Sequence, residues 1–138
     1  RGRVGWISHT AGSAVSAVAH QAEVSGIGID LEQDRDVADI VHLVAFGAER
    51  DWLDSHPASI RERKMLELFA AKESLFKAVF PTVKRYFDFD AVELEPQVDG
   101  SIFRGRFLTP LDGLAPHTTV TISVGRSDHE VLALAVLA

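Results

Sequence analysis

The sequence contains no cysteine, which excludes disulfides, thiolate zinc sites and cysteine nucleophiles. An excess of positive charge is lacking as well: the formal net charge of −6 argues against nucleic acid as the main partner. The longest fully apolar run, residues 131–138, is too short to cross a bilayer, so we expect no membrane span. No secretory signal is visible, and we expect a cytoplasmic protein. The first residue is Arg1, not methionine, and we therefore expect a trimmed chain.

The composition is that of a globular domain, with 46% hydrophobic and 25% charged residues. Alternating patterns predict strands, and three- and four-residue spacing predicts helices. The expected strands are residues 4–9, 13–20, 26–32, 89–94, 101–108, 118–124 and 131–137. Turns are expected at Ala11-Gly12, Asp99-Gly100 and Asp112-Gly113. The expected helices are residues 40–46, 48–53 and 60–80, the last ended by Pro81. Together they predict an α+β fold, one long helix packed on a mostly antiparallel sheet.

Two acids lie two residues apart on the strand predicted at 26–32. Asp30 and Glu32 therefore project from the same face, which Gly28 shares. Neighbouring carboxylates repel each other unless a cation neutralises them, and oxygen ligands of this kind favour Mg²⁺. Gly28 would allow a ligand or a second backbone to approach closely. A solvent-facing strand with two acids is the alternative, and the pair alone does not exclude it.

A second charged motif lies in the middle of the long predicted helix. Glu73 is about 40° around the helix from the apolar Phe69, and Lys77 follows one turn later on nearly the same side. A solvated Glu-Lys pair would explain this spacing. An acid at the edge of the apolar face could instead reach the neighbouring strand and join Asp30 and Glu32 in a three-carboxylate site. Lysines beside it would then meet phosphates that the metal attracts.

The two motifs together resemble the signature of the 4′-phosphopantetheinyl transferase superfamily. Its elements here are Gly-Ile-Asp-Leu-Glu at 28–32 and Lys-Glu-Ser-Leu-Phe-Lys-Ala at 72–78. Ile-Ser-His at 7–9 resembles the Ser-His element of the larger surfactin- and enterobactin-type branch. Phe-Pro at 80–81 and Arg-Tyr-Phe-Asp-Phe at 85–89 resemble the segment that follows the helix in enterobactin-type members.

The resemblance implies Mg²⁺-dependent transfer of the phosphopantetheine arm of coenzyme A to a serine of an acyl or peptidyl carrier protein, with release of adenosine 3′,5′-bisphosphate. Asp30, Glu32 and Glu73 would hold Mg²⁺, and Glu73, directly or through water, would deprotonate the carrier serine. Lys77 would stabilise the phosphate under attack, with assistance from Lys72. The remaining implied coenzyme A contacts are His9, which would bind the pyrophosphate, and Ser8 beside it.

The resemblance also implies that part of the family's binding site lies elsewhere. The larger branch is a pseudo-dimer of two similar halves, with coenzyme A between them. We therefore expect residues 1–24 to be the remnant of an N-terminal subdomain and residues 25–138 to be the C-terminal subdomain. An incomplete fragment, a half supplied by another chain and a self-associating compact member all remain open, and cutting would expose apolar surface.

The carrier protein is the expected partner, docked on basic residues and on the apolar segment 40–46. The candidate basic residues are Arg61, Arg63, Lys64, Lys84 and Arg85. A solvated charged face would explain the same residues without any partner. Two other functions remain open: a non-catalytic carrier-binding module or inactive remnant, and another Mg²⁺-dependent enzyme that acts on a pyrophosphate.

Overall fold

The computed structural model describes residues 2–10, 12–21, 23–97 and 100–138. Its strands are β1 (Arg3–His9), β2 (Ala14–His20), β3 (Gly26–Gln33), β4 (Val92–Pro96), β5 (Ile102–Phe107), β6 (Thr119–Arg126) and β7 (Glu130–Leu137). The α-helices are α1 (Val41–Val44), α2 (Ala48–Asp54) and α3 (Ala58–Val83), and the short 3₁₀ turns are η1 (Ala38–Ile40) and η2 (Phe89–Ala91). This confirms the predicted α+β fold with one long helix on an antiparallel sheet. None of the described helices is long and apolar enough to span a membrane.

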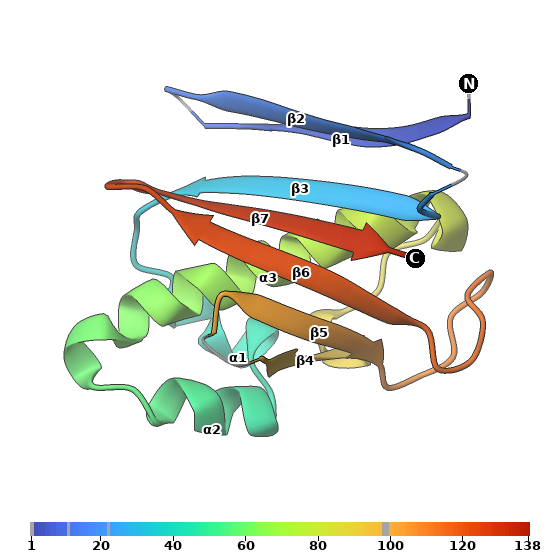
Figure 1. The fold of residues 1–138 in the computed structure, drawn as a ribbon. Helices are drawn as coiled ribbons and strands as arrows, with labels where there is room; N and C mark the ends of the chain where they lie inside the picture. Colours follow the sequence, from blue (N-terminus) through green and yellow to red (C-terminus); the bar gives the residue numbers. More distant parts are fainter. Residues whose placement is uncertain (1, 11, 22, 98–99) are drawn as a thin grey trace.

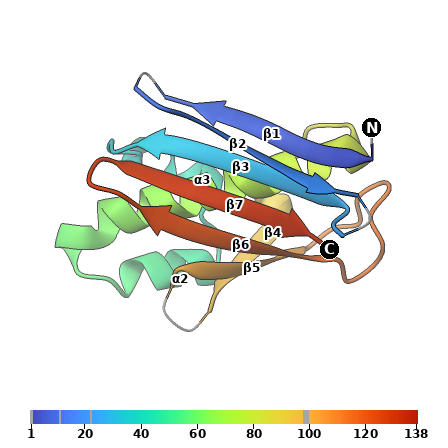
Figure 2. The ribbon, with the colours of Figure 1, turned by 45° about the horizontal axis from the view of Figure 1, so that its top comes forward.

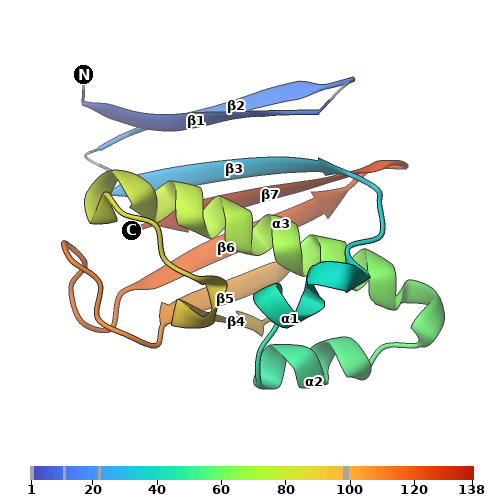
Figure 3. The ribbon, with the colours of Figure 1, turned by 180° about the vertical axis from the view of Figure 1, so that it is seen from behind.

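Five strands form an antiparallel sheet in the order β3-β7-β6-β5-β4. The long helix α3 crosses one face of this sheet, and α1 and α2 pack near its β4–β5 end (Figure 3). Alternate residues of β7, from Val131 to Leu137, are buried on the face that α3 covers. The strand that carries the two acids, β3, is therefore placed directly against the helix that carries the second motif.

The hairpin of β1 and β2 forms a separate two-stranded sheet. It runs alongside β3, beyond the edge of the larger sheet, as two views show (Figures 1 and 2). One face of the hairpin is exposed, with Ile7 68% and Val18 65% accessible. The predicted turn at Ala11-Gly12 and the one at Asp99-Gly100 each include a residue, Ala11 or Asp99, that lies outside the described residues.

Two predicted boundaries are wrong. Pro81 does not end the helix, because α3 continues to Val83 and ends only at Lys84, which adopts a left-handed conformation with φ of 58°. A proline so close to the end removes one hydrogen bond of the last turn, and burial of Val83 offsets that loss. Residues 89–91 form a 3₁₀ turn and not the start of a strand, since the side chain of Lys72 binds the carbonyl oxygens of Phe89 and Val92.

Candidate functional site

The first strand of the larger sheet and the long helix meet at Gly28. A Cβ atom at this position would collide with the carbonyl oxygen of Ser74 and the amide nitrogen of Ala78. From the sequence, either a ligand or a second backbone is expected to approach Gly28. The structure shows a second backbone, that of α3. Because side chains alternate along β3, Asp30 points to the same side as Gly28, towards α3.

Asp30 is almost completely buried at this contact, with 4% of its surface exposed. Its Oδ1 atom accepts a hydrogen bond of 3.1 Å from Nζ of Lys77, which also donates to the carbonyl oxygen of Ile29 at 3.1 Å. The other oxygen, Oδ2, is buried and has no hydrogen-bond partner among the described residues. An unpartnered buried carboxylate oxygen is costly, so this atom marks a place where a cation would be stabilised.

Three carboxylates influence one another across this contact. Burial, which is the largest cause, and the neighbouring carboxylate of Glu32 raise the pKa of Asp30 to about 8, although Lys77 opposes the rise. Burial also raises the pKa of Glu73; Lys77 and Arg35 lower it, and the charge of Glu32 raises it. The sequence prediction that Glu73 faces the acids of β3 is consistent with this coupling. Excess negative charge of this kind is relieved by a bound divalent cation.

The donor set fits Mg²⁺, which prefers carboxylate oxygens and retains several waters. Within the described ranges, no three acidic or imidazole side chains converge closely enough to form a ready-made metal cluster. Asp30 and Glu32 border the same cleft and interact through their charges, and Glu73 lies within electrostatic reach of Glu32. The acids therefore offer an incomplete ligand set, as expected for an ion that recruits phosphate oxygens from its substrate.

An open cleft of about 450 Å³ lies over this acidic pair. Its wall on the hairpin side includes Ser8, His9 and Thr10, and its floor includes Asp30 and Glu32. Lys77 also lines it. The Ser-His element and the acidic motif, 22 positions apart in the sequence when counted from Ser8 to Asp30, thus share one cleft.

Ser8 and His9 occupy different environments in this cleft. The hydroxyl oxygen of Ser8 is buried and accepts a hydrogen bond of 2.9 Å from the backbone N–H of Leu31. It therefore ties β1 to the acid-bearing strand. His9 is exposed and borders the opening, where its ring is accessible to a ligand.

Arg35 belongs to the same cleft, although the sequence interpretation gave it no role. Its guanidinium donates to Oε1 of Glu32 at 2.9 Å and lies over the ring of Phe69, 5.5 Å from the centroid. Residues 33–39, which lie between an expected strand and an expected helix, have no periodicity that would single out one of their charges. A spacing of three residues from Glu32 was the available signal, and loop residues do not follow such spacing reliably.

Lys72 lies away from the acidic cleft, in the protein interior. Its ammonium is completely buried and donates to Oε1 of Glu49 at 2.8 Å, to the carbonyl oxygen of Phe89 at 3.0 Å and to that of Val92 at 3.3 Å. Glu49 in turn accepts from the backbone N–H groups of Phe46 and Leu94. The structure does not bring Lys72 to the predicted coenzyme A contacts, and no sequence signal marked Glu49 as its partner.

The candidate docking residues are divided between bonded and exposed side chains. Arg61 donates to backbone carbonyl oxygens between α2 and α3, including that of His56 at 2.9 Å, and Lys64 pairs with Glu67 at 3.2 Å. Lys84 and Arg85 are exposed. Next to them lies an aromatic cluster, in which the rings of Phe76 and Tyr86 stack with centroids 5.3 Å apart. Tyr86 is 79% exposed, so the cluster forms part of the surface.

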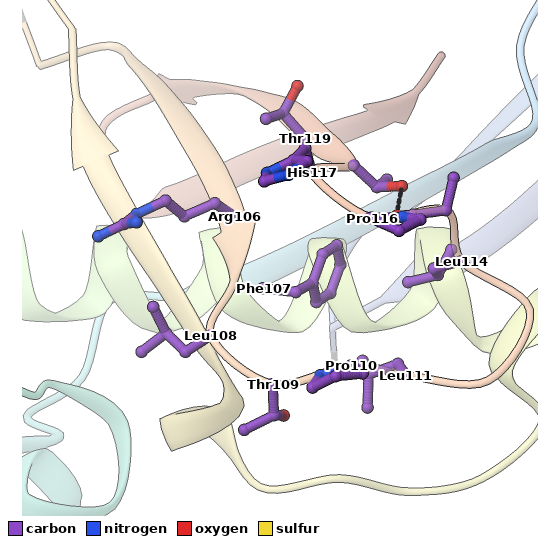
Figure 4. A pocket seen from close by; sticks show the side chains of 12 residues that line it. Arg106, Phe107, Leu108, Thr109, Pro110, Leu111, Leu114, Pro116, His117 and Thr119 are labelled. Atoms are coloured by element: carbon purple, nitrogen blue, oxygen red, sulfur yellow. Dashed lines mark hydrogen bonds between the residues drawn. The ribbon is translucent and has the colours of Figure 1, made fainter.

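A second cavity, of about 440 Å³, lies at the connection between β5 and β6 (Figure 4). Apolar side chains such as Phe107, Leu111 and Leu114 line much of it, and none of the described residues that line it is a carboxylate. Its arginine, Arg106, is already paired with Glu93 at 2.6 Å. None of the predicted site residues is here, and the described lining has no anionic ligand to neutralise a divalent cation.

The geometry of the acidic cleft agrees with the comparison to known families. Residues 26–135 match the family model described as the 4′-phosphopantetheinyl transferase superfamily, and the match covers most of the chain. This protein belongs to the 4′-phosphopantetheinyl transferase superfamily. The suspected resemblance is confirmed at this level.

Three curated relatives carry the same activity in their names. The chain is 35% identical over 113 residues to the 4′-phosphopantetheinyl transferase Svp of Streptomyces mobaraensis, with 79% of this chain and 45% of Svp covered. It is 31% identical to Npt of Nocardia iowensis, with 86% and 54% covered, and 31% identical to PptT of Mycobacterium tuberculosis, with 78% and 48% covered. The chain thus spans about half the length of these relatives.

The fold also resembles a solved structure, the holo-ACP-synthase from Plasmodium yoelii. The TM-score is 0.56 at 14% sequence identity, with 83% of this chain and 94% of that chain covered. At this identity the likeness supports the fold alone.

Proposed function

We propose that this chain carries the acidic half of a phosphopantetheinyl transferase site, which moves the phosphopantetheine arm of coenzyme A to a serine of an acyl or peptidyl carrier protein. The observation that carries the proposal is the buried Oδ2 of Asp30, which has no hydrogen-bond partner among the described residues and lies with Glu32 and Lys77 in an open cleft. A solvated acidic strand would not bury this oxygen or hold a lysine against it.

In the proposed reaction, the hydroxyl oxygen of the carrier serine attacks the phosphorus atom that bears the pantetheine. A new P–O bond to serine forms, and the bond to the bridging pyrophosphate oxygen breaks, which releases adenosine 3′,5′-bisphosphate. The serine proton passes to Glu73, whose pKa is raised by burial, which makes its carboxylate a stronger proton acceptor than an exposed one. No covalent enzyme intermediate is required, because such chemistry depends mainly on positioning and electrostatics.

Asp30, Glu32 and Glu73 would hold Mg²⁺, which when bound would neutralise pyrophosphate charge. Lys77 stands beside Asp30 with a partly exposed side chain and would place positive charge next to the phosphate under attack. His9, exposed at the opening, would donate a hydrogen bond to the pyrophosphate. Ser8 would support it by keeping β1 in place, since its hydroxyl oxygen is engaged by Leu31.

The carrier protein is the proposed partner. Exposed Lys84 and Arg85 offer positive charge for an acidic carrier, and Leu43, which is 58% exposed, offers apolar surface on the segment predicted to dock. The division at residues 1–24 and 25–138 remains a prediction, as does a second half that completes the coenzyme A site.

The test is to incubate the chain with coenzyme A, Mg²⁺ and an apo carrier domain, and then to weigh the carrier by mass spectrometry. We expect a mass gain of one phosphopantetheine when the second half of the coenzyme A site is also present, and no gain from Asp30→Ala or Glu73→Ala under the same conditions. Retained transfer by Asp30→Ala would contradict the assigned site. Retained carrier binding without any mass gain would favour a non-catalytic carrier-binding module.

A further inference from the structure

The β1–β2 hairpin is attached to the larger sheet through side chains. Among the described residues, no backbone hydrogen bond joins the hairpin strands to β3, and the hydrogen bonds between the two sheets come from Ser8, Thr10 and Ser13. The side chains of Ser8, Thr10 and Ser13 all lie at the same end of the hairpin. That end borders the acidic cleft, since Ser8 and Thr10 both line it.

Two of these three bonds go to one carboxylate. Oε2 of Glu130 accepts from the hydroxyl of Thr10 at 3.1 Å, and Oε1 accepts from the hydroxyl of Ser13 at 3.3 Å. Thr10 and Ser13 are themselves joined, because the N–H of Thr10 donates to the carbonyl oxygen of Ser13 at 2.8 Å. The carboxylate of Glu130 thus holds both sides of the hairpin turn. A charged acceptor makes such bonds stronger than a neutral one would.

Glu130 is well placed to act as a fixed anchor. It is the first residue of β7 and pairs in register with Gln33 of β3, one residue beyond Glu32. Glu130 therefore fixes the position of the hairpin turn relative to β3, the strand that carries the two acids. His9 lies between Ser8 and Thr10, so its position over the cleft depends on the same contacts.

We propose that Glu130 is a positioning residue for pyrophosphate binding, which holds the β1–β2 turn so that His9 and Thr10 form the wall of the cleft opposite Asp30 and Glu32. This inference rests on the proposed function, since the ligand is the pyrophosphate of coenzyme A. Glu130 does not itself line the cleft, and it acts through the turn. Without the carboxylate of Glu130, the hairpin would spend part of its time in positions where His9 and Thr10 do not border the cleft. The apparent affinity for coenzyme A would fall in proportion to the fraction of molecules in those positions.

The experiment compares Glu130→Ala with Glu130→Gln and with Glu23→Ala in the full chain. Glu23 is an exposed acid at the opposite end of the hairpin, so its removal matches the change in charge. The readouts are hydrogen exchange of the β1 and β2 amides without ligand, thermal unfolding, and calorimetric titration with coenzyme A in the presence of Mg²⁺. Glutamine keeps one carbonyl acceptor and should retain part of the effect.

For Glu130→Ala we expect faster exchange near the turn and about tenfold weaker coenzyme A binding, with a melting temperature close to that of Glu23→Ala. Glu130→Gln should lie between Glu130→Ala and the unaltered chain. Unchanged hairpin exchange, or unchanged affinity despite faster exchange, would overturn this inference alone. Failure of the unaltered chain to bind coenzyme A would overturn the proposed function and this inference with it.

Discussion

Two lysines of one motif, five positions apart on α3, have opposite surroundings. Lys72 is completely buried between α2, β4 and η2, and its ammonium is satisfied by Glu49 and two carbonyl oxygens. Lys77 pairs with Asp30, keeps 19% of its side chain exposed and lines an open cleft. In the Lys72 pair every polar atom of the carboxylate has a partner, whereas Asp30 leaves Oδ2 without one.

The difference distinguishes an ion pair that holds the fold together from one that is available for chemistry. A buried pair with all hydrogen bonds made has nothing left to offer a ligand, and breaking it leaves a charge in the interior. A pair at a cleft with an unsatisfied oxygen has capacity for a cation and a substrate. Lys72 and Lys77 carry the same charge and belong to the same sequence motif, so neither property predicts which of the two ion pairs is buried.

The largest effect on stability is expected from Lys72→Met. Loss of the ammonium leaves Glu49 buried without its counter-charge, and the free energy of unfolding should fall by about 3–5 kcal/mol. Urea denaturation measures this change. The double variant Lys72→Met with Glu49→Leu removes both charges and should recover much of the loss. A loss below about 1 kcal/mol for Lys72→Met would show that the two lysines do not differ in this way.

Gly28→Ala tests the Lys77–Asp30 pair by disturbing the backbone contact between β3 and α3. A methyl group there collides with the backbone of α3 at Ser74 and Ala78, and overpacking of this kind costs about 1–3 kcal/mol. The separation of β3 from α3 should weaken the Lys77–Asp30 contact and leave the Lys72–Glu49 pair intact. Urea denaturation gives the stability, and a crystal structure of the variant gives the two contacts. Gly125→Ala is a control, since nothing lies within contact distance of a Cβ at that position.

Asp30→Asn should make the metal-free chain more stable at alkaline pH. Asp30 has a pKa of about 8 in the folded chain and 3.8 as its ordinary value, so the folded state binds the extra proton between them. The stability contributed by that proton is complete below pH 4 and is lost as the pH rises through 8. At pH 8 without metal we expect a gain of about 1–2 kcal/mol from asparagine.

Thermal unfolding from pH 4 to pH 9, with and without Mg²⁺, measures this effect. Asparagine should flatten the pH dependence, and the variant should lose transfer activity although it is more stable. An unaltered pH profile in Asp30→Asn would contradict the assignment of the shifted group.

Lys77→Met should have the smallest effect on stability. The side chain is partly exposed, and Asp30, whose pKa is already raised to about 8, can stay protonated near neutral pH when its counter-charge is lost, so we expect a loss of about 1 kcal/mol. Transfer activity should fall by about 100-fold or more, because a fixed positive charge next to the phosphate is lost. Carrier mass spectrometry over time measures the rate. Lys77→Arg keeps the charge and should retain more activity, and equal rates for both variants would exclude this role.

Much of the fold could be read from local patterns. The alternation of Ile27, Ile29 and Leu31 with Gly28 and Asp30 predicted that the two sets point to opposite sides of β3, and the structure places the helix on the side of Gly28 and Asp30. Boundaries were harder, because they depend on contacts made later in the chain. The carbonyl oxygens of Phe89 and Val92 accept hydrogen bonds from Lys72, and no local sequence pattern near residue 89 predicts that contact.

The sequence by itself determined the family, through the resemblance of its motifs, together with the α+β class and the shared face of Gly28 and Asp30, because these follow from motif spacing and from side-chain alternation within single elements. The tertiary structure alone decided that Lys72 binds Glu49 in the interior, that Ser8 ties β1 to Leu31, and that Glu130 holds the hairpin turn. The physical reason is the separation in sequence between the residues that interact. A strand or helix pattern reports which way a side chain points, whereas the partner of a buried charge or hydroxyl is chosen by how distant elements pack.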